Sequence, residues 1–186
     1  MPPRCSVTAQ EAASYVRGLC PSCGGRGSAV KRTTLKALLQ PRALGRLERV
    51  DYKFCLNPSC PVVYFSQLSV YRKEDLKVRV GLKETENPVP VCYCFGYTEE
   101  SIWDEIRRTG RSTAAQTIAA HVKAGRCGCE MNNPAGSCCL GEVNRVVNEG
   151  IARFPAVGAE ASARVSMTVP DECCSAGSAG SCKGAL

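Results

Sequence analysis

The sequence has none of the long apolar runs that carry a chain into or across a membrane. Its first residues, MPPRCSVTAQE, contain no apolar stretch of secretory type, and nowhere do about eighteen apolar residues follow one another. It also lacks a glycine-rich phosphate loop, a Ser-His-Asp set and a paired-acid site, and its one histidine is His121. We therefore expect a cytoplasmic protein without membrane insertion and without a conventional catalytic site.

Runs of five or more basic residues are also absent, which argues against a nucleic-acid partner. The formal net charge is +7, but it counts every cysteine as neutral. A zinc ion held by four thiolates carries a net charge of about −2, and so does an oxidised two-iron cluster. With both kinds of site loaded the chain is only mildly basic, so we expect its scattered lysines and arginines to form a solvated surface.

Cysteine, in contrast, is abundant, with 14 in 186 residues. Grouped thiols form a disulfide framework, a zinc site or an iron–sulfur cluster. Disulfide scaffolds belong to secreted chains, so the expected cytoplasmic location favours metal sites. No βαβ pattern surrounds the first pair, which disfavours a thioredoxin-type redox motif. Most of the cysteines lie in tight pairs, which are Cys20/Cys23, Cys55/Cys60, Cys92/Cys94, Cys127/Cys129 and Cys138/Cys139.

The chain is expected to be α+β and to fall into four segments. These are a small zinc-bound β-rich domain at 10–83, a linker at 84–90, a small helical domain at 91–154 and a flexible tail at 155–186. The linker has two prolines in a polar stretch, which favours an extended conformation. The tail is rich in Ala, Ser and Gly and lacks the apolar surface needed to order itself.

Local patterns predict the elements within the two domains. In the first, β-branched and aromatic residues around an Asn-Pro-Ser turn predict strands, and a threonine cap predicts a helix that ends near Pro41. In the second, caps, glycine stops and apolar residues four apart predict three helices. The helices expected are 11–19, 33–39, one that starts at Thr98 and stops at Gly110, 113–123 and 140–153, and the strands expected are 51–55, 62–65, 69–72 and 76–80.

Zinc is the metal expected in the first domain. Cys20-x2-Cys23 and Cys55-x4-Cys60 are two short pairs on turns, which supply tetrahedral thiolates with little strain. Free structural cysteines are one alternative. A nucleic-acid-binding zinc ribbon is another, but the strands lack a basic stripe with interleaved aromatics.

The second domain needs a different centre. Cys92-x-Cys94 places two thiolates on one turn, close enough to hold the same iron of a two-iron cluster, while later cysteines at a helix start can hold the other iron. The helix that begins near Leu140 points its positive end at such a cluster and stabilises the anionic centre. A Rieske-type role for His121 is disfavoured, because that centre needs two histidines on one iron.

These motifs resemble known families. Val91-Cys92-Tyr93-Cys94, followed by paired helices and a second cysteine loop, is similar to the bacterioferritin-associated ferredoxin-like [2Fe-2S] domain. From about Cys20 to Val147 the chain resembles the N-terminal domain of CopZ-type copper chaperones. The motifs that carry this second resemblance are Cys20-x2-Cys23, Phe54-Cys55-x4-Cys60-Pro61, Val70-Tyr71-Arg72-Lys73, Leu76-Lys77-Val78-Arg79-Val80-Gly81, Pro90-Val91-Cys92-Tyr93-Cys94 and Asn133-Pro134-Ala135-Gly136-Ser137-Cys138-Cys139.

The resemblance implies a zinc ion plus a [2Fe-2S] cluster in a protein that handles copper or a similar soft metal and reduces Cu(II) to Cu(I). Cys127 stays a rival for Cys129, and Cys138 for Cys139; a spare thiol beside the cluster would be a transient Cu(I) ligand. The ligands that the resemblance implies are Cys20, Cys23, Cys55 and Cys60 for zinc, and Cys92, Cys94, Cys129 and Cys139 for the cluster.

The sequence departs from that family in the part that binds and delivers the transported metal ion. Full-length chaperones of this type carry a Met-x-Cys-x-x-Cys loop that passes Cu(I) to a partner pump, a metal-transport ATPase, and this sequence has no such loop. Its tail carries Cys173, Cys174 and Cys182 instead, which either capture a soft ion such as Cu(I) or Hg(II) or are incidental. Two functions follow. One is a metallochaperone with at most a Cu(II) reductase activity, and the other is a small [2Fe-2S] electron carrier with a redox partner and a structural zinc.

Overall fold

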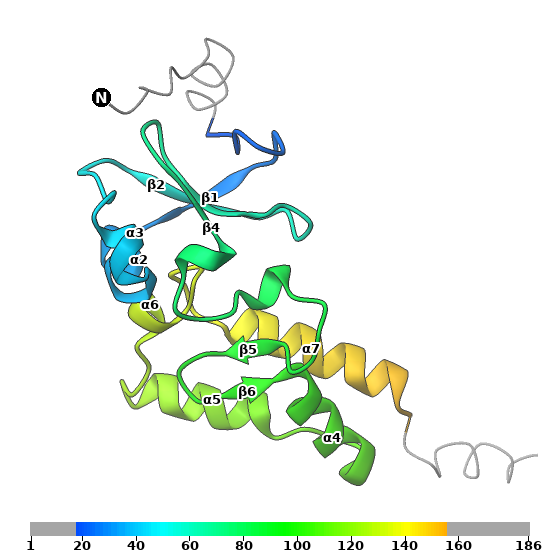
Figure 1. Cartoon of the computed structure of the whole chain (residues 1–186). Coiled ribbons are helices and arrows are strands. Elements are labelled where there is room, and N and C mark those ends of the chain that lie inside the picture. The colour runs from blue at the N-terminus through cyan, green and yellow to red at the C-terminus, as the bar shows by residue number, and fades with distance from the viewer. Residues whose placement is uncertain (1–17, 156–186) are drawn as a thin grey trace, which may run out of the picture. The chain divides into compact units, whose positions relative to one another are not determined.

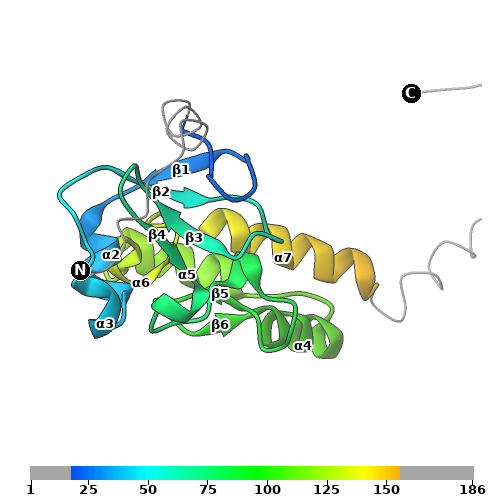
Figure 2. The same ribbon diagram turned by 45° about the horizontal axis from the view of Figure 1, so that its top comes forward.

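A four-stranded antiparallel sheet organises the first half of the described chain (Figures 1 and 2). The computed structural model describes residues 18–155. The strands follow one another in the sheet in chain order, and each pairs antiparallel with its neighbour. Their bounds are Gly27–Val30 for β1, Tyr52–Cys55 for β2, Val62–Phe65 for β3 and Val70–Arg72 for β4.

One expected strand, 76–80, is wrong, and three observed strands were not expected, one in this sheet and two in the hairpin of the second half. Leu76 forms a single bridge with Leu39, and Val80 is buried in the core without pairing. In this sheet the unexpected strand is β1, which pairs along its length with β2 from Gly27↔Cys55 to Val30↔Tyr52. The apolar alternation of 76–80 therefore reflects burial in the core and not membership of a sheet.

Two short helices pack on this sheet. Helix α2, Arg32–Leu38, and α3, Pro41–Leu44, are separated because the residue before Pro41 is extended, with ψ 153° at Gln40. This confirms the expected helix and its end near Pro41. The core between helices and sheet consists of buried apolar side chains, among them Leu35, Leu39, Ala43, Tyr52, Phe54, Val63, Tyr64, Tyr71, Leu76 and Val80.

The second half begins with a β-hairpin and continues with helices. Thr98 caps the first helix by accepting a hydrogen bond from the Ser101 N–H at 3.2 Å, and Gly110, with φ 74°, ends it. The three expected helices are confirmed, and their apolar faces form a second core that includes Ile102, Ile106, Ile118, Val143 and Val146. The elements are β5 Pro90–Cys92, β6 Tyr97–Thr98, α4 Glu99–Thr109, α5 Ala114–Lys123, α6 Cys129–Asn132 and α7 Leu140–Arg153.

The two halves are in contact. Helix α2 of the first half packs on α6 of the second, and Ala135 packs against the first core. The division into domains with a linker at 84–90 stays a prediction. The expected helix at 11–19 lies almost wholly outside the described residues, as does the tail from 156 onward. Within residues 18–155, no helix is long and apolar enough to cross a membrane.

Candidate metal centres

The first group of cysteines is carried by two tight turns at one end of the four-stranded sheet. Cys20 and Cys23 lie on the turn before β1, where the Cys20 N–H donates to the Gly25 carbonyl and the Gly24 N–H donates back to Cys20, both at 2.8 Å. Cys55 ends β2, and Cys60 precedes β3 after a turn. Because β1 and β2 are paired neighbours, the register brings both turns together.

The four sulfurs lie in the arrangement that a single zinc ion requires. The Sγ atoms of Cys20 and Cys60 are 3.9 Å apart, those of Cys23 and Cys55 are 3.7 Å apart, and all four lie within 4.8 Å of one another. A tetrahedral ion with Zn–S bonds of about 2.3 Å separates its sulfurs by about 3.8 Å. The donor set and its spacing therefore fit zinc.

Burial controls the acidity of these thiols. It raises the pKa of Cys55 to about 12, although the Asn57 N–H and the charge of Lys83 act against it. Burial also opposes ionisation of Cys23, but the Gly25 N–H and the neighbouring thiols outweigh it and lower that pKa to about 7. Three of the four cysteines, Cys20, Cys55 and Cys60, are at most 4% exposed. The three buried members of the set become thiolates only with a cation among the sulfurs.

The second group comes from the β5–β6 hairpin and from a later loop. Cys92 ends β5, Cys94 lies in the hairpin turn, Cys129 begins α6 and Cys139 immediately precedes α7. The Sγ atoms of Cys94 and Cys129 are 3.7 Å apart, and the Cys139 thiol lies close enough to that of Cys92 for the two to interact. The structure thus brings the four sulfurs together as two close pairs.

The surroundings of these sulfurs supply hydrogen-bond donors. The Gly128 N–H donates to Cys94 Sγ at 3.4 Å, Asn132 Nδ2 lies 3.6 Å from the same sulfur, and the Cys139 N–H donates to Cys129. Burial nevertheless raises the pKa of Cys129 to about 12 and raises that of Cys139 as well. Donors aimed at sulfur stabilise thiolates, which is what a metal centre needs from its outer shell.

The two rival cysteines are placed differently. Cys138 is exposed whereas Cys139 beside it is 4% exposed, and Cys127 is half-buried. Cys138 and Cys139 both line a cavity of about 620 Å³. In the part of the chain from 18 to 155, the group at Cys20, Cys23, Cys55 and Cys60 is the one set of three or more ligand atoms lying within 4.8 Å of one another. The second group is more widely spread.

Sequence reasoning missed the side chains that surround the cysteines. Lys83 is 6% exposed and its Nζ donates to the Asn57 carbonyl at 2.7 Å, beside the turn that carries Cys60. Tyr93, between two predicted ligands, hydrogen-bonds to the segment after β4. His121 stacks on Phe95 with ring centroids 4.5 Å apart, which is a packing role. No local pattern identifies such contacts, since each joins residues at least ten positions apart.

A four-cysteine group on two turns of a small antiparallel sheet defines a zinc-binding domain. Residues 17–77 match the family zf_CopZ, described as "Zinc binding domain". The chain is 35% identical over 127 residues to the copper chaperone CopZ of Archaeoglobus fulgidus, a match that covers 68% of this chain and 60% of that protein. The chain therefore contains a zinc-binding domain of this family and is a homologue of that chaperone.

A solved structure extends the likeness to the fold. The N-terminal domain of Archaeoglobus fulgidus CopZ superimposes with a TM-score of 0.59 and 36% identity, over 69% of this chain and 96% of that domain. This chain spans 60% of the length of the full curated chaperone.

Proposed function

We propose that this protein is a metallochaperone of the CopZ type that binds soft metal, copper first among them, and carries zinc and a [2Fe-2S] cluster as resident cofactors. The observation that carries the proposal is the combination of homology to a copper chaperone with two separate cysteine groups in one chain. Chemical softness favours Cu(I) or Hg(II) as the cargo of a thiol-rich protein.

The zinc ligands in this proposal are Cys20, Cys23, Cys55 and Cys60. Their sulfur separations of 3.7 and 3.9 Å, their burial and the family match over residues 17–77 support the assignment. Zinc has no redox chemistry, so its role here is to hold the first half together.

The cluster ligands in this proposal are Cys92, Cys94, Cys129 and Cys139. Two close sulfur pairs suit a binuclear centre better than a mononuclear one. The thiol contacts made by Cys129 and Cys139 support these two over Cys127 and Cys138. The free amides at the start of α7, a helix of 14 residues, would stabilise the anionic charge beside Cys139. A [2Fe-2S] cluster bound here would supply one electron at a time, which is enough to reduce Cu(II) to Cu(I).

The copper step requires a soft ligand close to this centre. Cys138 is exposed, lines the cavity of about 620 Å³ and is adjacent to Cys139, which supports it as a transient Cu(I) ligand. An outside redox partner would return the electron, and a metal-transport ATPase would accept the Cu(I). We place these exchanges in the cytoplasm.

A second function, a small [2Fe-2S] electron carrier with structural zinc, is favoured by one observation. The two cysteine groups supply all the ligands that such a carrier requires, and it needs no further thiol. Affinity for Cu(I) beyond the zinc and the cluster separates the two functions, because an electron carrier requires none.

The test of the proposed cofactors is metal analysis with an optical spectrum of the full chain purified without oxygen. Two irons, two sulfides and one zinc per chain, with visible charge-transfer bands, are expected. Zinc alone in a colourless protein would overturn the cluster assignment and leave the zinc site standing. Iron without zinc would overturn the zinc assignment.

A further inference from the structure

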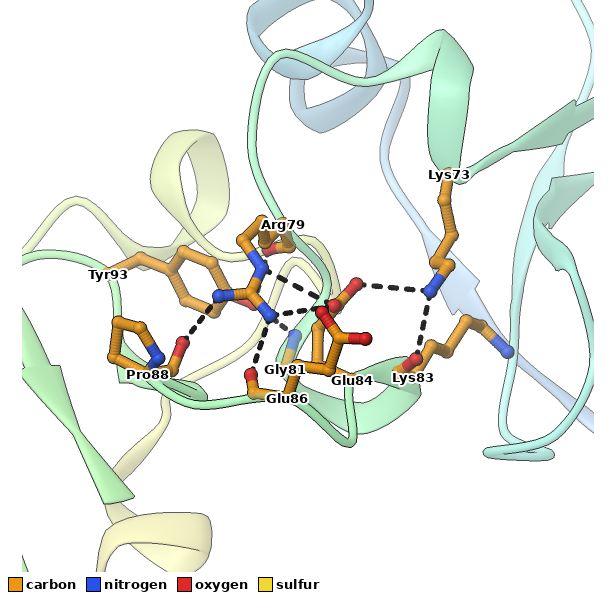
Figure 3. Close-up of polar contacts among 8 residues, drawn as sticks. All are labelled: Lys73, Arg79, Gly81, Lys83, Glu84, Glu86, Pro88 and Tyr93. Carbon is orange, nitrogen blue, oxygen red and sulfur yellow. Dashed lines mark hydrogen bonds and ion pairs between the residues drawn. The ribbon is translucent and has the colours of Figure 1, made fainter. Parts of the chain in front are cut away.

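Tyr93 lies between Cys92 and Cys94 in sequence, yet its side chain is attached to the first half of the molecule (Figure 3). Its hydroxyl accepts a hydrogen bond from the Gly81 N–H at 2.7 Å and donates one to the Arg79 carbonyl at 3.0 Å. The hairpin that carries two predicted cluster ligands is therefore tied to the segment that follows β4.

That segment is itself held firmly. The Arg79 guanidinium donates to the Glu84 carboxylate at 2.9 Å and to the carbonyls of Glu86 and Pro88 at 2.6 and 2.7 Å. The Glu84 side chain is 14% exposed and also pairs with Lys73 at 3.2 Å. Figure 3 shows these side chains converging around Glu84. A segment held by this many hydrogen bonds and ion pairs restricts the movement of the hairpin that Tyr93 attaches to it.

The same segment also reaches the first cysteine group. Lys83 follows Gly81 on the short 3₁₀ helix η2, Gly81–Lys83, and its buried Nζ donates to the Asn57 carbonyl at 2.7 Å. That carbonyl also accepts the Cys60 N–H at 3.2 Å. A continuous set of contacts thus runs from the turn of Cys60 through η2 to Tyr93.

The loop with the other two predicted ligands has its own attachments to the first half. Tyr64 of β3 is fully buried and its hydroxyl donates to the Pro134 carbonyl at 2.8 Å. The Thr34 hydroxyl of α2 donates at 2.6 Å to the backbone carbonyl of Glu130, the residue after Cys129. The Glu130 carboxylate accepts from Lys31 at 2.9 Å and from Thr33 at 2.7 Å.

We propose that Tyr93 and Tyr64 are positioning residues for the second cysteine group, holding the hairpin of Cys92 and Cys94 and the loop of Cys129 and Cys139 against the zinc-binding half. The first half thereby sets the position of the two hairpin cysteines relative to the two loop cysteines. This inference rests on the proposed function, since the group to be positioned is the predicted cluster site.

The test compares three single substitutions in the full chain, each of which removes one hydroxyl. Tyr93→Phe and Tyr64→Phe each remove an attachment. Tyr97→Phe is the matched control, because Tyr97 lies on the same hairpin as Tyr93 and no hydrogen bond of its hydroxyl is observed within the described residues. Tyr93→Phe and Tyr64→Phe should each keep zinc, change the visible circular-dichroism spectrum and lose iron to a chelator about fivefold faster than the unaltered chain, the effect of one hydrogen bond. The double variant should lose iron about 25-fold faster if the ties act independently.

A second readout needs no cluster. In the iron-free, zinc-loaded chain, alkylation of Cys92 and Cys94 should be faster in Tyr93→Phe, and alkylation of Cys129 and Cys139 faster in Tyr64→Phe, with Tyr97→Phe like the unaltered chain. Equal alkylation rates in all four proteins would overturn the positioning role.

Iron and sulfide missing from the unaltered chain would instead overturn the proposed cluster, and the alkylation rates would still decide the inference. Loss of zinc from Tyr64→Phe would show misfolding of that variant, and Tyr93→Phe, on a half-buried residue, would then decide alone.

Discussion

Lys83 is a charged side chain buried beside the first cysteine group. Its Nζ lies near Cys55 and 5.9 Å from the centre of the Phe54 ring, with the Asn57 carbonyl as its hydrogen-bond acceptor. A lysine at 6% exposure is costly unless an opposite charge offsets it. Four thiolates around zinc supply a net charge of about −2, so the lysine and the proposed zinc site stabilise each other. A buried cation next to grouped cysteines is thus independent support for a thiolate centre.

Gly81 lies where the backbones of the two halves approach each other closely. A Cβ at this position would lie 1.9 Å from the Pro90 carbonyl oxygen, so any larger residue must push β5 away. We expect Gly81→Ala to lower the free energy of unfolding by about 1–3 kcal/mol through overpacking. Gly45→Ala is the matched control, because nothing lies within 4 Å of its added Cβ. Thermal unfolding of the zinc-loaded proteins measures both, and equal melting temperatures would contradict the close packing.

At the scale of elements, the segment from β4 to β5 contains only short 3₁₀ helices, and charge pairs between its side chains help to hold it. Burial opposes ionisation of Glu84, but hydrogen bonds and charges from Arg79 and Lys73 outweigh it and hold its pKa below 4.5. A carboxylate whose pKa is lower in the folded state stabilises the fold fully at pH well above 4.5. That contribution disappears as the pH falls through the lower, folded pKa.

The pH dependence gives a direct prediction for Glu84→Gln. The substitution should cost about 1 kcal/mol of unfolding free energy at pH 7, and the difference from the unaltered chain should shrink as the pH falls below 4.5. Denaturant unfolding between pH 3 and pH 7 measures the difference. Glu86→Gln is the control, because its side chain is exposed and its backbone carbonyl makes the contact with Arg79. A difference that stays constant over this pH range would rule out the proposed charge pairing.

Local sequence patterns predicted most elements but not their long-range contacts. Caps and glycine stops identified α4, α5 and α7, and β-formers around a turn identified β2 and β3. Strand β1, Gly27–Val30, was missed because Gly-Ser-Ala carries little strand propensity, and pairing with β2 alone makes it a strand. Spacing likewise predicted the first group of four cysteines, whereas it left rivals open in the second group, whose ligands stay a prediction. The hydroxyl of Tyr93 and the amine of Lys83 were out of reach, since their roles depend on partners brought near by the fold.

At the scale of the whole molecule, two cysteine groups with different geometry share one chain. One is a set of four sulfurs within 4.8 Å, suited to a single ion, and the other consists of two pairs, each of which joins the β5–β6 hairpin to the later loop. Contacts through α2 and α6 and through Tyr93 join the halves that carry them. The proposed cofactors would occupy eight of the 14 cysteines, so the cargo has to bind the others.

Those six remaining cysteines decide between metal carrier and electron carrier, and they are Cys5, Cys127, Cys138, Cys173, Cys174 and Cys182. We expect the chain loaded with zinc and iron to bind about one further Cu(I) against a competing colorimetric chelator, because vicinal thiolates are soft ligands.

Changing Cys173, Cys174 and Cys182 together to serine should abolish this binding, and Cys138→Ser should slow the uptake. Cys5→Ser, which alters a cysteine with no neighbouring thiol in sequence, should leave both unchanged. Unaltered stoichiometry in the triple variant would remove the tail from the proposal, and no Cu(I) uptake by the unaltered chain would leave the electron carrier as the function.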